Sequence, residues 1–212
     1  MKLIVISNSS AVENEVQIIT ALFELGLETF HLRKHKFSTK QIKKLLNEIP
    51  SHFHNRIVLH SHHKLARTYD LKGIHMTKLH KRRKLRTWYV TRTVQIRKPK
   101  ILITTSYSNM GQLLDTNKQI CNYDYVFLSP IFDSLSSKFQ SGFTEFSLKS
   151  AMGKTNLLVI ARGGVDVNAV EKANAIGFHG IALYSCLWKR KDPIVEFNKI
   201  VEKFQELKIP IE

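Results

Sequence analysis

The sequence predicts an α/β protein that folds as a single (β/α)8 barrel domain over residues 1–212. Short runs of β-branched and other apolar residues alternate with segments of helical spacing along nearly the whole chain. Strands separated by helices form parallel sheets with helical crossovers. Eight such strands favour closure into a TIM barrel over an open sheet. No linker or change of composition divides the chain.

The first half of the chain supplies four expected strands, each a short apolar run bounded by polar or turn residues: 2–7, 27–33, 56–60 and 73–76. A helix is expected over 13–23 from its apolar spacing, with Gly26 as its stop signal. The next helix, 40–49, begins after a capping Ser38 and ends before Pro50. A short helix is expected at 63–69.

The second half supplies four more strand-like runs: 101–104, 124–128, 157–165 and 180–186. The helices expected between and after them are 108–119, 145–152, 167–176 and 193–207. Asp192 followed by Pro193 is a favourable start for the last helix. The stretch 78–100 is the least regular part, and no element is assigned to it.

The last two runs end in turns that suit a phosphate group. Gly163 and Gly164 end the seventh, and Ser185 and Cys186 end the eighth. Glycine lets backbone N–H groups approach an anion closely, and a helix start adds unpaired donors. The loops after strands 7 and 8 of such barrels form the usual phosphate site. The alternative, an ordinary Gly-Gly turn, remains open.

The net charge of +16 is concentrated in one part of the chain. No acidic residue occurs between Leu71 and Leu114, and Lys78 to Lys100 contains ten Lys or Arg. Such a run can bind nucleic acid or attract phosphorylated ligands. Nucleic acid is the less favoured partner, because no known recognition motif accompanies the run. No apolar run reaches the ~18 residues of a membrane span, and the two cysteines indicate a reducing, cytoplasmic location.

The ends of the expected strands carry mostly polar and cationic residues, and carboxylates are rare among them. The set comprises Ser7, Asn8, His31, Arg33, Lys34, His60, Ser61, His75, Thr77, Thr105, Tyr107, Ser129 and Phe132. It predicts an anionic substrate and argues against a two-carboxylate hydrolase. His60, His62 and His63 could hold Zn²⁺, but no Cys or carboxylate completes that set. His75 is interpreted as a core histidine.

Four segments resemble the thiamine phosphate synthases and the related thiazole tautomerases of the TenI type. They are His31-Leu-Arg-Lys34, Arg56-Ile-Val-Leu-His-Ser61 with Gly73-Ile-His-Met76, Asp124-Tyr-Val-Phe-Leu-Ser-Pro-Ile-Phe132, and Ala161-Arg-Gly-Gly-Val165 with Gly180-Ile-Ala-Leu-Tyr-Ser185. The resemblance runs from about Lys2 to Trp188. It implies a cytoplasmic barrel that joins hydroxymethylpyrimidine diphosphate to thiazole phosphate and releases diphosphate.

The sequence departs from this family where the family binds Mg²⁺. The two carboxylate positions fall on Ser61 and on His80 or its neighbour Leu79. The family's glutamine after strand 2 is His31, and the histidine that tautomerases use after strand 5 falls on Tyr107. Mg²⁺ is therefore expected only if it arrives with the diphosphate substrate, and no metal ligand or other cofactor is predicted.

The predicted catalytic residues are Arg33 and Tyr107. The predicted substrate- and phosphate-binding residues are His31, Arg33, Lys34, Thr105, Lys138, Gly163, Gly164, Ser185 and Cys186. The expected partners are small phosphorylated substrates, with no membrane. Two alternatives stay open: a tautomerase-like or non-catalytic phosphate-binding regulatory protein, and a nucleic-acid-binding protein. The oligomeric state is not predicted.

Overall fold

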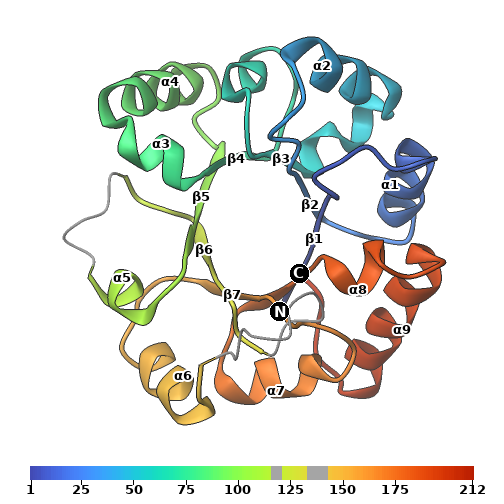
Figure 1. The fold of residues 1–212 in the computed structure, drawn as a ribbon, viewed down its shortest axis with the longest axis vertical. Helices are drawn as coiled ribbons and strands as arrows, with labels where there is room; N and C mark the ends of the chain where they lie inside the picture. The colour runs from blue at the N-terminus through green and yellow to red at the C-terminus, as the bar shows by residue number, and fades with distance from the viewer. Residues whose placement is uncertain (116–120, 133–142) are drawn as a thin grey trace. The chain divides into compact units, whose positions relative to one another are not determined.

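A computed structural model describes residues 1–115, 121–132 and 143–212. Eight parallel strands follow one another in chain order around a closed barrel, with helices between them (Figure 1). The strands are β1 (Lys2–Ile6), β2 (Thr29–Leu32), β3 (Ile57–Leu59), β4 (Gly73–Met76), β5 (Leu102–Tyr107), β6 (Tyr125–Leu128), β7 (Val159–Arg162) and β8 (Gly180–Leu183). The predicted fold class is confirmed.

Contacts divide the chain into two compact units. The first comprises Met1–Val5, Ser106–Gln119 and Asp124–Glu212. In it β6 pairs with β7, β7 with β8, and β8 with β1. Gly180 lies where these strands approach closely, since a Cβ there would collide with the carbonyl oxygen of Lys2. Glycine at the start of β8 therefore allows β1 to lie beside it.

The helices of the first unit are α5 (Met110–Leu114), α6 (Glu145–Met152), α7 (Ala169–Ile176), α8 (Ser185–Trp188) and α9 (Pro193–Glu206). Helix α9 begins as expected, because the Asp192 carboxylate accepts hydrogen bonds from the N–H groups of Ile194 and Val195. Its apolar face buries Phe197, Ile200 and Phe204. The expected helix over 108–119 is shorter among the described residues, and 116–119 lie outside them.

The second unit comprises Ile6–Thr105 and Ile120–Tyr123. In it β2, β3, β4 and β5 pair in order. Its helices are α1 (Glu15–Glu24), α2 (Thr39–Glu48), α3 (Lys78–Arg82) and α4 (Lys84–Arg97), with two 3₁₀ helices, η1 (Ser51–Arg56) and η2 (His63–Arg67). The predicted capping of α2 is present, since Ser38 Oγ accepts from the N–H of Gln41. The short helix expected at 63–69 is the 3₁₀ segment η2.

The basic stretch 78–100 is more regular than the sequence indicated, because it contains α3 and the long helix α4. The buried residues of α4 are Thr87, Thr91 and Val94. Two of these three are polar, so the buried face has no apolar periodicity for a sequence pattern to detect. Leu85, Trp88, Tyr89 and Ile96 are instead exposed. Among the described residues, no helix is long and apolar enough to cross a membrane.

Candidate functional site

In the first unit, the turn after β7 has the backbone that only glycine adopts readily. Gly163 and Gly164 have φ angles of 88° and 66°, in the left-handed region. A Cβ on Gly163 would lie 3.1 Å from the Cα of Pro130. Beside it, the N–H groups of Ile131 and Phe132 donate to the carbonyls of Arg162 and Gly163. The turn is therefore held tightly, and its two glycines leave backbone without side chains to cover it.

The two helices that follow β7 and β8 differ in which groups accept hydrogen bonds from the backbone N–H groups at their starts. Asp166 Oδ1 accepts from the N–H groups of Asn168 and Ala169, so a carboxylate of the chain already caps α7. Helix α8 starts at Ser185, immediately after Tyr184, with no side-chain cap. The start of α8 is thus the better placed of the two to receive an external anion.

Cys186 is the second residue of α8, and its side chain is buried. The side chain is 4% exposed. Burial raises the pKa of its thiol to about 11, so the thiol is neutral at physiological pH. An uncharged sulfur does not repel a phosphate group, but it is also a poor nucleophile.

In the second unit, three histidines converge from adjacent strands. His31 lies in β2, His60 directly follows β3, and His75 lies in β4. Each offers one ring nitrogen such that the three atoms lie within 4.8 Å of one another. We call His31, His60 and His75 the three-histidine cluster. It is the one group of three or more His, Cys, Asp or Glu within metal-binding distance in the described part of the chain.

The rings of this cluster are buried and bonded to their neighbours. Their exposed fractions are 0% for His31, 5% for His60 and 2% for His75. His31 Nδ1 lies 2.8 Å from His60 Nε2, and His75 Nδ1 lies 2.8 Å from Thr104 Oγ1. The sequence interpretation of His75 as a core residue fits its burial, but its neighbours were not foreseen.

Lys34 and Arg33 follow β2 in different surroundings. Lys34 is fully buried, with Nζ 2.6 Å from Glu15 Oε1, and it donates to the carbonyl oxygen of Ser10. Burial lowers the pKa of Lys34 and raises that of Glu15. Arg33 is half-buried, and its N–H donates to Ser7 Oγ. Substrate binding by Lys34 would therefore require the side chain to leave a buried carboxylate, whereas Arg33 has no such ion pair among the described residues.

A cationic cavity of about 330 Å³ lies beside α4 in the same unit. Lys64, Arg83 and Arg86 line it, together with His62, His63 and His80. We call it the arginine cavity. His63 Nε2 is buried there and has no hydrogen-bond partner within the described residues. Burial, and then the neighbouring His80, lower the pKa of His63 to about 3, so His63 adds no positive charge to the cavity at neutral pH.

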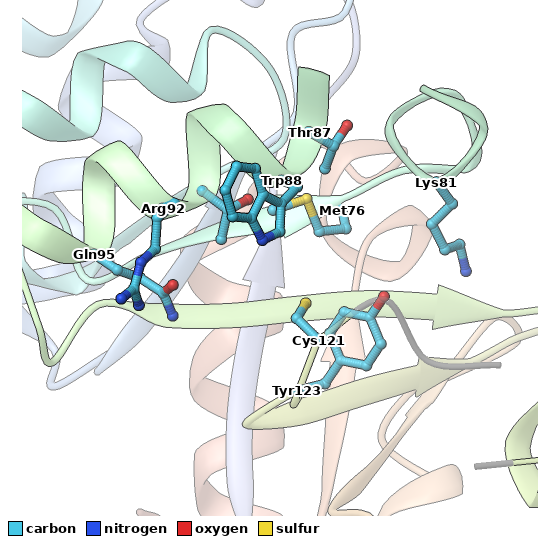
Figure 2. Close-up of a pocket in the computed structure, with 9 residues that line it drawn as sticks. Met76, Lys81, Thr87, Trp88, Arg92, Gln95, Cys121 and Tyr123 are labelled. Atoms are coloured by element: carbon cyan, nitrogen blue, oxygen red, sulfur yellow. The ribbon is translucent and has the colours of Figure 1, made fainter. Parts of the chain in front are cut away.

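A second cavity of about 300 Å³ lies between α4 and the segment before β6 (Figure 2). Met76, Trp88, Cys121 and Tyr123 form its apolar part, and Lys81, Arg92 and Gln95 add polar groups. This lining suits a flat ring with an anionic substituent. None of the predicted site residues lines this cavity within the described part of the chain.

Thr105 and Tyr107 are not among the residues that line either cavity. Thr105 is buried, and its hydroxyl donates to the carbonyl of Met76 at 2.8 Å. Tyr107 is the last residue of β5 and is 7% exposed. Its backbone carbonyl accepts a hydrogen bond from the N–H of Ser129. Lys138 lies outside the described residues. The roles of these three stay predictions.

His60 does not form a metal-binding group with His62 and His63 among the described residues. Strand β3 ends at Leu59, and His62 has a left-handed φ of 54°, so His62 does not continue the strand. His62 instead bonds Thr39 Oγ1 and the carbonyl of Phe37, and the ring of His63 faces that of His80 at 4.3 Å. His60 joins His31 and His75 because all three stand at the ends of consecutive parallel strands. The sequence contained a signal for this grouping, because each of the three histidines stands at the end of an expected strand.

The positions where the resemblance predicts Mg²⁺ ligands hold Ser61 and His80 or its neighbour Leu79. None of these three residues offers the carboxylate oxygen that Mg²⁺ usually takes. His80 Nδ1 is engaged by the N–H and the hydroxyl of Thr77 at the start of α3. The cluster that the structure does assemble offers nitrogen ligands.

Comparisons with known proteins identify the family and the fold. The family model described as thiamine monophosphate synthase matches residues 3–187. A thiamine phosphate pyrophosphorylase from Bacteroides thetaiotaomicron is 26% identical, with 97% of this chain and 98% of that chain covered and a TM-score of 0.72. None of the curated proteins matches this chain.

Two more distant structures show the same fold. A thiamine phosphate pyrophosphorylase from Pyrococcus furiosus is 16% identical, with 97% and 96% coverage and a TM-score of 0.75. A geranylgeranylglyceryl phosphate synthase from Thermoplasma acidophilum is 12% identical, with 97% and 93% coverage and a TM-score of 0.67. The match over residues 3–187 establishes that this chain belongs to the family described as thiamine monophosphate synthase.

Proposed function

We propose that this chain binds phosphorylated thiazole and pyrimidine intermediates of thiamine biosynthesis and joins them in the manner of a thiamine phosphate synthase. The observation that carries the proposal is the paired turn of the first unit. There Gly163 and Gly164 hold positive φ angles after β7, and α8 starts uncapped after β8. Backbone donors at such a place suit the phosphate of the thiazole substrate.

The proposed reaction separates charge before it forms a bond. The carbon–oxygen bond of the pyrimidine methylene breaks, and the diphosphate leaves with the bonding pair. The thiazole nitrogen then donates its pair to the methylene cation. Because the leaving group gains negative charge in the transition state, cationic groups around it accelerate the step.

Arginine and lysine side chains take this task in our proposal, since the residues present do not fit Mg²⁺. Arg33 after β2 is one candidate, and Arg83 and Arg86 of the arginine cavity are two more. Arginine suits a diphosphate because its planar guanidinium donates two parallel hydrogen bonds to phosphate oxygens. Three monovalent cations neutralise a diphosphate less compactly than a divalent ion does, so we expect slow turnover.

A coupling assay on the purified chain tests this function. Thiazole phosphate and hydroxymethylpyrimidine diphosphate are supplied together, with and without Mg²⁺, and released diphosphate is measured. We expect weak turnover that changes little on addition of Mg²⁺. Robust turnover with a steep Mg²⁺ requirement would contradict the proposed role of the arginines. Failure to bind either substrate in calorimetry would contradict the function as a whole.

One observation favours a second candidate, a phosphate-binding protein without synthase chemistry. Lys34, which stands beside the family's lysine position, is tied to Glu15 in the interior. In that case thiazole phosphate binds at the β7 and β8 turns and no diphosphate is released. Binding without turnover in the same two measurements identifies this candidate. Nucleic-acid binding by α4 is the least favoured candidate, and binding that survives physiological salt would promote it.

A further inference from the structure

We propose that the three-histidine cluster binds one divalent transition-metal ion of the Zn²⁺ or Co²⁺ class. This inference goes beyond the proposed function and does not depend on it. It starts from the donor atoms that the interior brings together: three imidazole nitrogens within 4.8 Å of one another, whereas Mg²⁺ takes hard oxygen ligands. Neutral imidazoles suit Zn²⁺, Co²⁺ and similar ions.

The backbone holds the three residues in a fixed frame. Strands β2, β3 and β4 are parallel neighbours, with His31 opposite Val58 and Leu59 opposite Ile74. His60 follows Leu59 and His75 follows Ile74, so the two histidines lie side by side. Hydrogen bonds between the strands continue past β3, since the N–H of His60 donates to the carbonyl of Leu32. A site built on strands is positioned more accurately than one on loops.

The spacing of one nitrogen pair is close to what a tetrahedral ion requires, and all three ligand nitrogens lie within 4.8 Å of one another. Bonds of about 2.0–2.1 Å from Zn²⁺ to nitrogen place two ligand atoms about 3.3 Å apart. His31 Nδ1 and His60 Nε2 are 2.8 Å apart and share one proton in a hydrogen bond. When an ion enters, that proton moves to the other nitrogen of its ring, and the two nitrogens separate by about half an ångström to accept the ion between them.

Thr104 supplies the outer partner that metal-binding histidines commonly have. Its hydroxyl lies 2.8 Å from His75 Nδ1, so coordination by His75 uses Nε2. Thr104 stands opposite His75 in the register of β4 and β5. Such a partner selects the tautomer and restrains the ring before any ion binds.

One ring must turn for all three to coordinate. The rings of His60 and His75 are stacked, with centroids 4.0 Å apart and planes 20° apart, whereas His31 is roughly perpendicular to both. Stacked rings direct their lone pairs side by side, so an ion held by both requires rotation about a terminal torsion, which is a soft degree of freedom. Loss of this stack is therefore a structural signature of the bound ion.

Burial determines how the ion gains access. With all three rings at most 5% exposed, an ion from solution reaches them slowly once the chain has folded. Three protein ligands leave a fourth position for water or a ligand oxygen. We therefore expect the ion to be captured during folding and retained afterwards.

The experiment uses the full chain, unfolded in denaturant with a chelator and refolded with one equivalent of Co²⁺ or Zn²⁺. We expect one ion per chain by elemental analysis, a Co²⁺ visible spectrum of tetrahedral intensity, and nitrogen-only neighbours from the protein in X-ray absorption. His31→Gln and His75→Gln should each weaken the affinity by more than about 100-fold. Loss of an outer-shell partner alone costs 10–100-fold, which is the loss expected for Thr104→Val.

His35→Gln and His62→Gln are the matched controls. Neither residue belongs to the cluster, and both should retain the ion. If His31→Gln fails to fold, the wild-type absorption data still decide, because they count imidazole ligands directly. Absence of bound metal after both refolding and long incubation of the folded chain would overturn the proposal. An equal loss of metal affinity in the cluster variants and the control variants would also overturn it. Substrate turnover enters none of these measurements, so they fail or succeed separately from the proposed function.

Discussion

Lys34 Nζ lies 2.6 Å from Glu15 Oε1, and both side chains are buried inside the second unit. The pair joins the end of β2 to the first turn of α1. Both charges are removed from water here. Removing one partner would therefore leave the other charge buried without compensation and destabilise the fold. Lys34, which the sequence predicted as a substrate-binding residue, is thus part of the interior in this structure.

The first prediction concerns this pair. Lys34→Met should lower the free energy of unfolding by about 3–5 kcal/mol, because it leaves the Glu15 carboxylate buried without its partner. The double variant Lys34→Met with Glu15→Gln should recover most of that loss. Chemical denaturation monitored by circular dichroism measures both.

Lys44→Met is the control for this prediction. It removes an exposed pair with Glu48 at 3.8 Å, and exposed pairs of this spacing contribute about 0.3–0.5 kcal/mol. Equal effects of Lys34→Met and Lys44→Met would show that the buried pair has no special role in stability.

The second prediction concerns the glycine turn after β7. Gly163→Ala should abolish binding of inorganic phosphate or thiazole phosphate, because the added Cβ meets the backbone of Pro130 and shifts the turn. Gly26→Ala is the matched control: its φ of 94° imposes the same left-handed cost of about 1–2 kcal/mol, but nothing lies within 4 Å of its Cβ. Calorimetric titration that shows equal phosphate affinity in both variants would rule out this turn as the phosphate site.

The third prediction separates direct binding from long-range attraction in the basic helices. Arg83→Gln with Arg86→Gln removes two charges that line the arginine cavity. Arg82→Gln with Lys84→Gln removes two charges from the same segment that do not line it. The cavity pair should weaken diphosphate binding at both low and physiological salt.

The control pair should slow association at low salt only, since the attraction between exposed charges is screened within about 8 Å at physiological salt. Stopped-flow measurements at two salt concentrations distinguish the two effects. Identical salt dependence in the two double variants would mean that the cavity attracts the ligand without binding it.

The fourth prediction concerns the two cysteines. Burial raises the pKa of Cys186 to about 11, so at pH 8 its thiol is protonated and covered. Iodoacetamide should therefore modify the partly exposed Cys121 well before Cys186 in the native chain, as read by mass spectrometry of peptides. Faster modification of Cys186 would show that its turn opens readily.

The same shift has a consequence for stability at high pH. The folded thiol titrates at about 11 and the unfolded one at its ordinary 9.0. The contribution of Cys186 to stability is therefore present below pH 9 and is lost as the pH rises toward 11. The variant Cys186→Ser should flatten this part of the stability profile.

Sequence patterns alone determined the architecture and one part of the candidate site. Period-two and continuous apolar runs located all eight strands, because a strand buried in a parallel barrel leaves a short, dense signal such as Tyr125 to Leu128. Gly163 and Gly164 were identified from the sequence as a turn, and both have positive φ angles in the structure, whereas their binding of phosphate stays a prediction. The capping residues Ser38 and Asp192 were recognised for an equally local reason, since each contacts residues two or three positions along the chain.

The tertiary structure decided what lies between elements. Helix α4 had no apolar stripe to reveal it, because two of its three buried residues are threonines. The partner of Lys34 is nineteen positions away, and only the docking of α1 brings Glu15 to it. His31, His60 and His75 were each identified at a strand end, but their convergence depends on the register of β2, β3 and β4, which pairs residues from three separate segments. Local sequence specifies periodicity and turns, whereas contacts between distant segments follow from how the strands align.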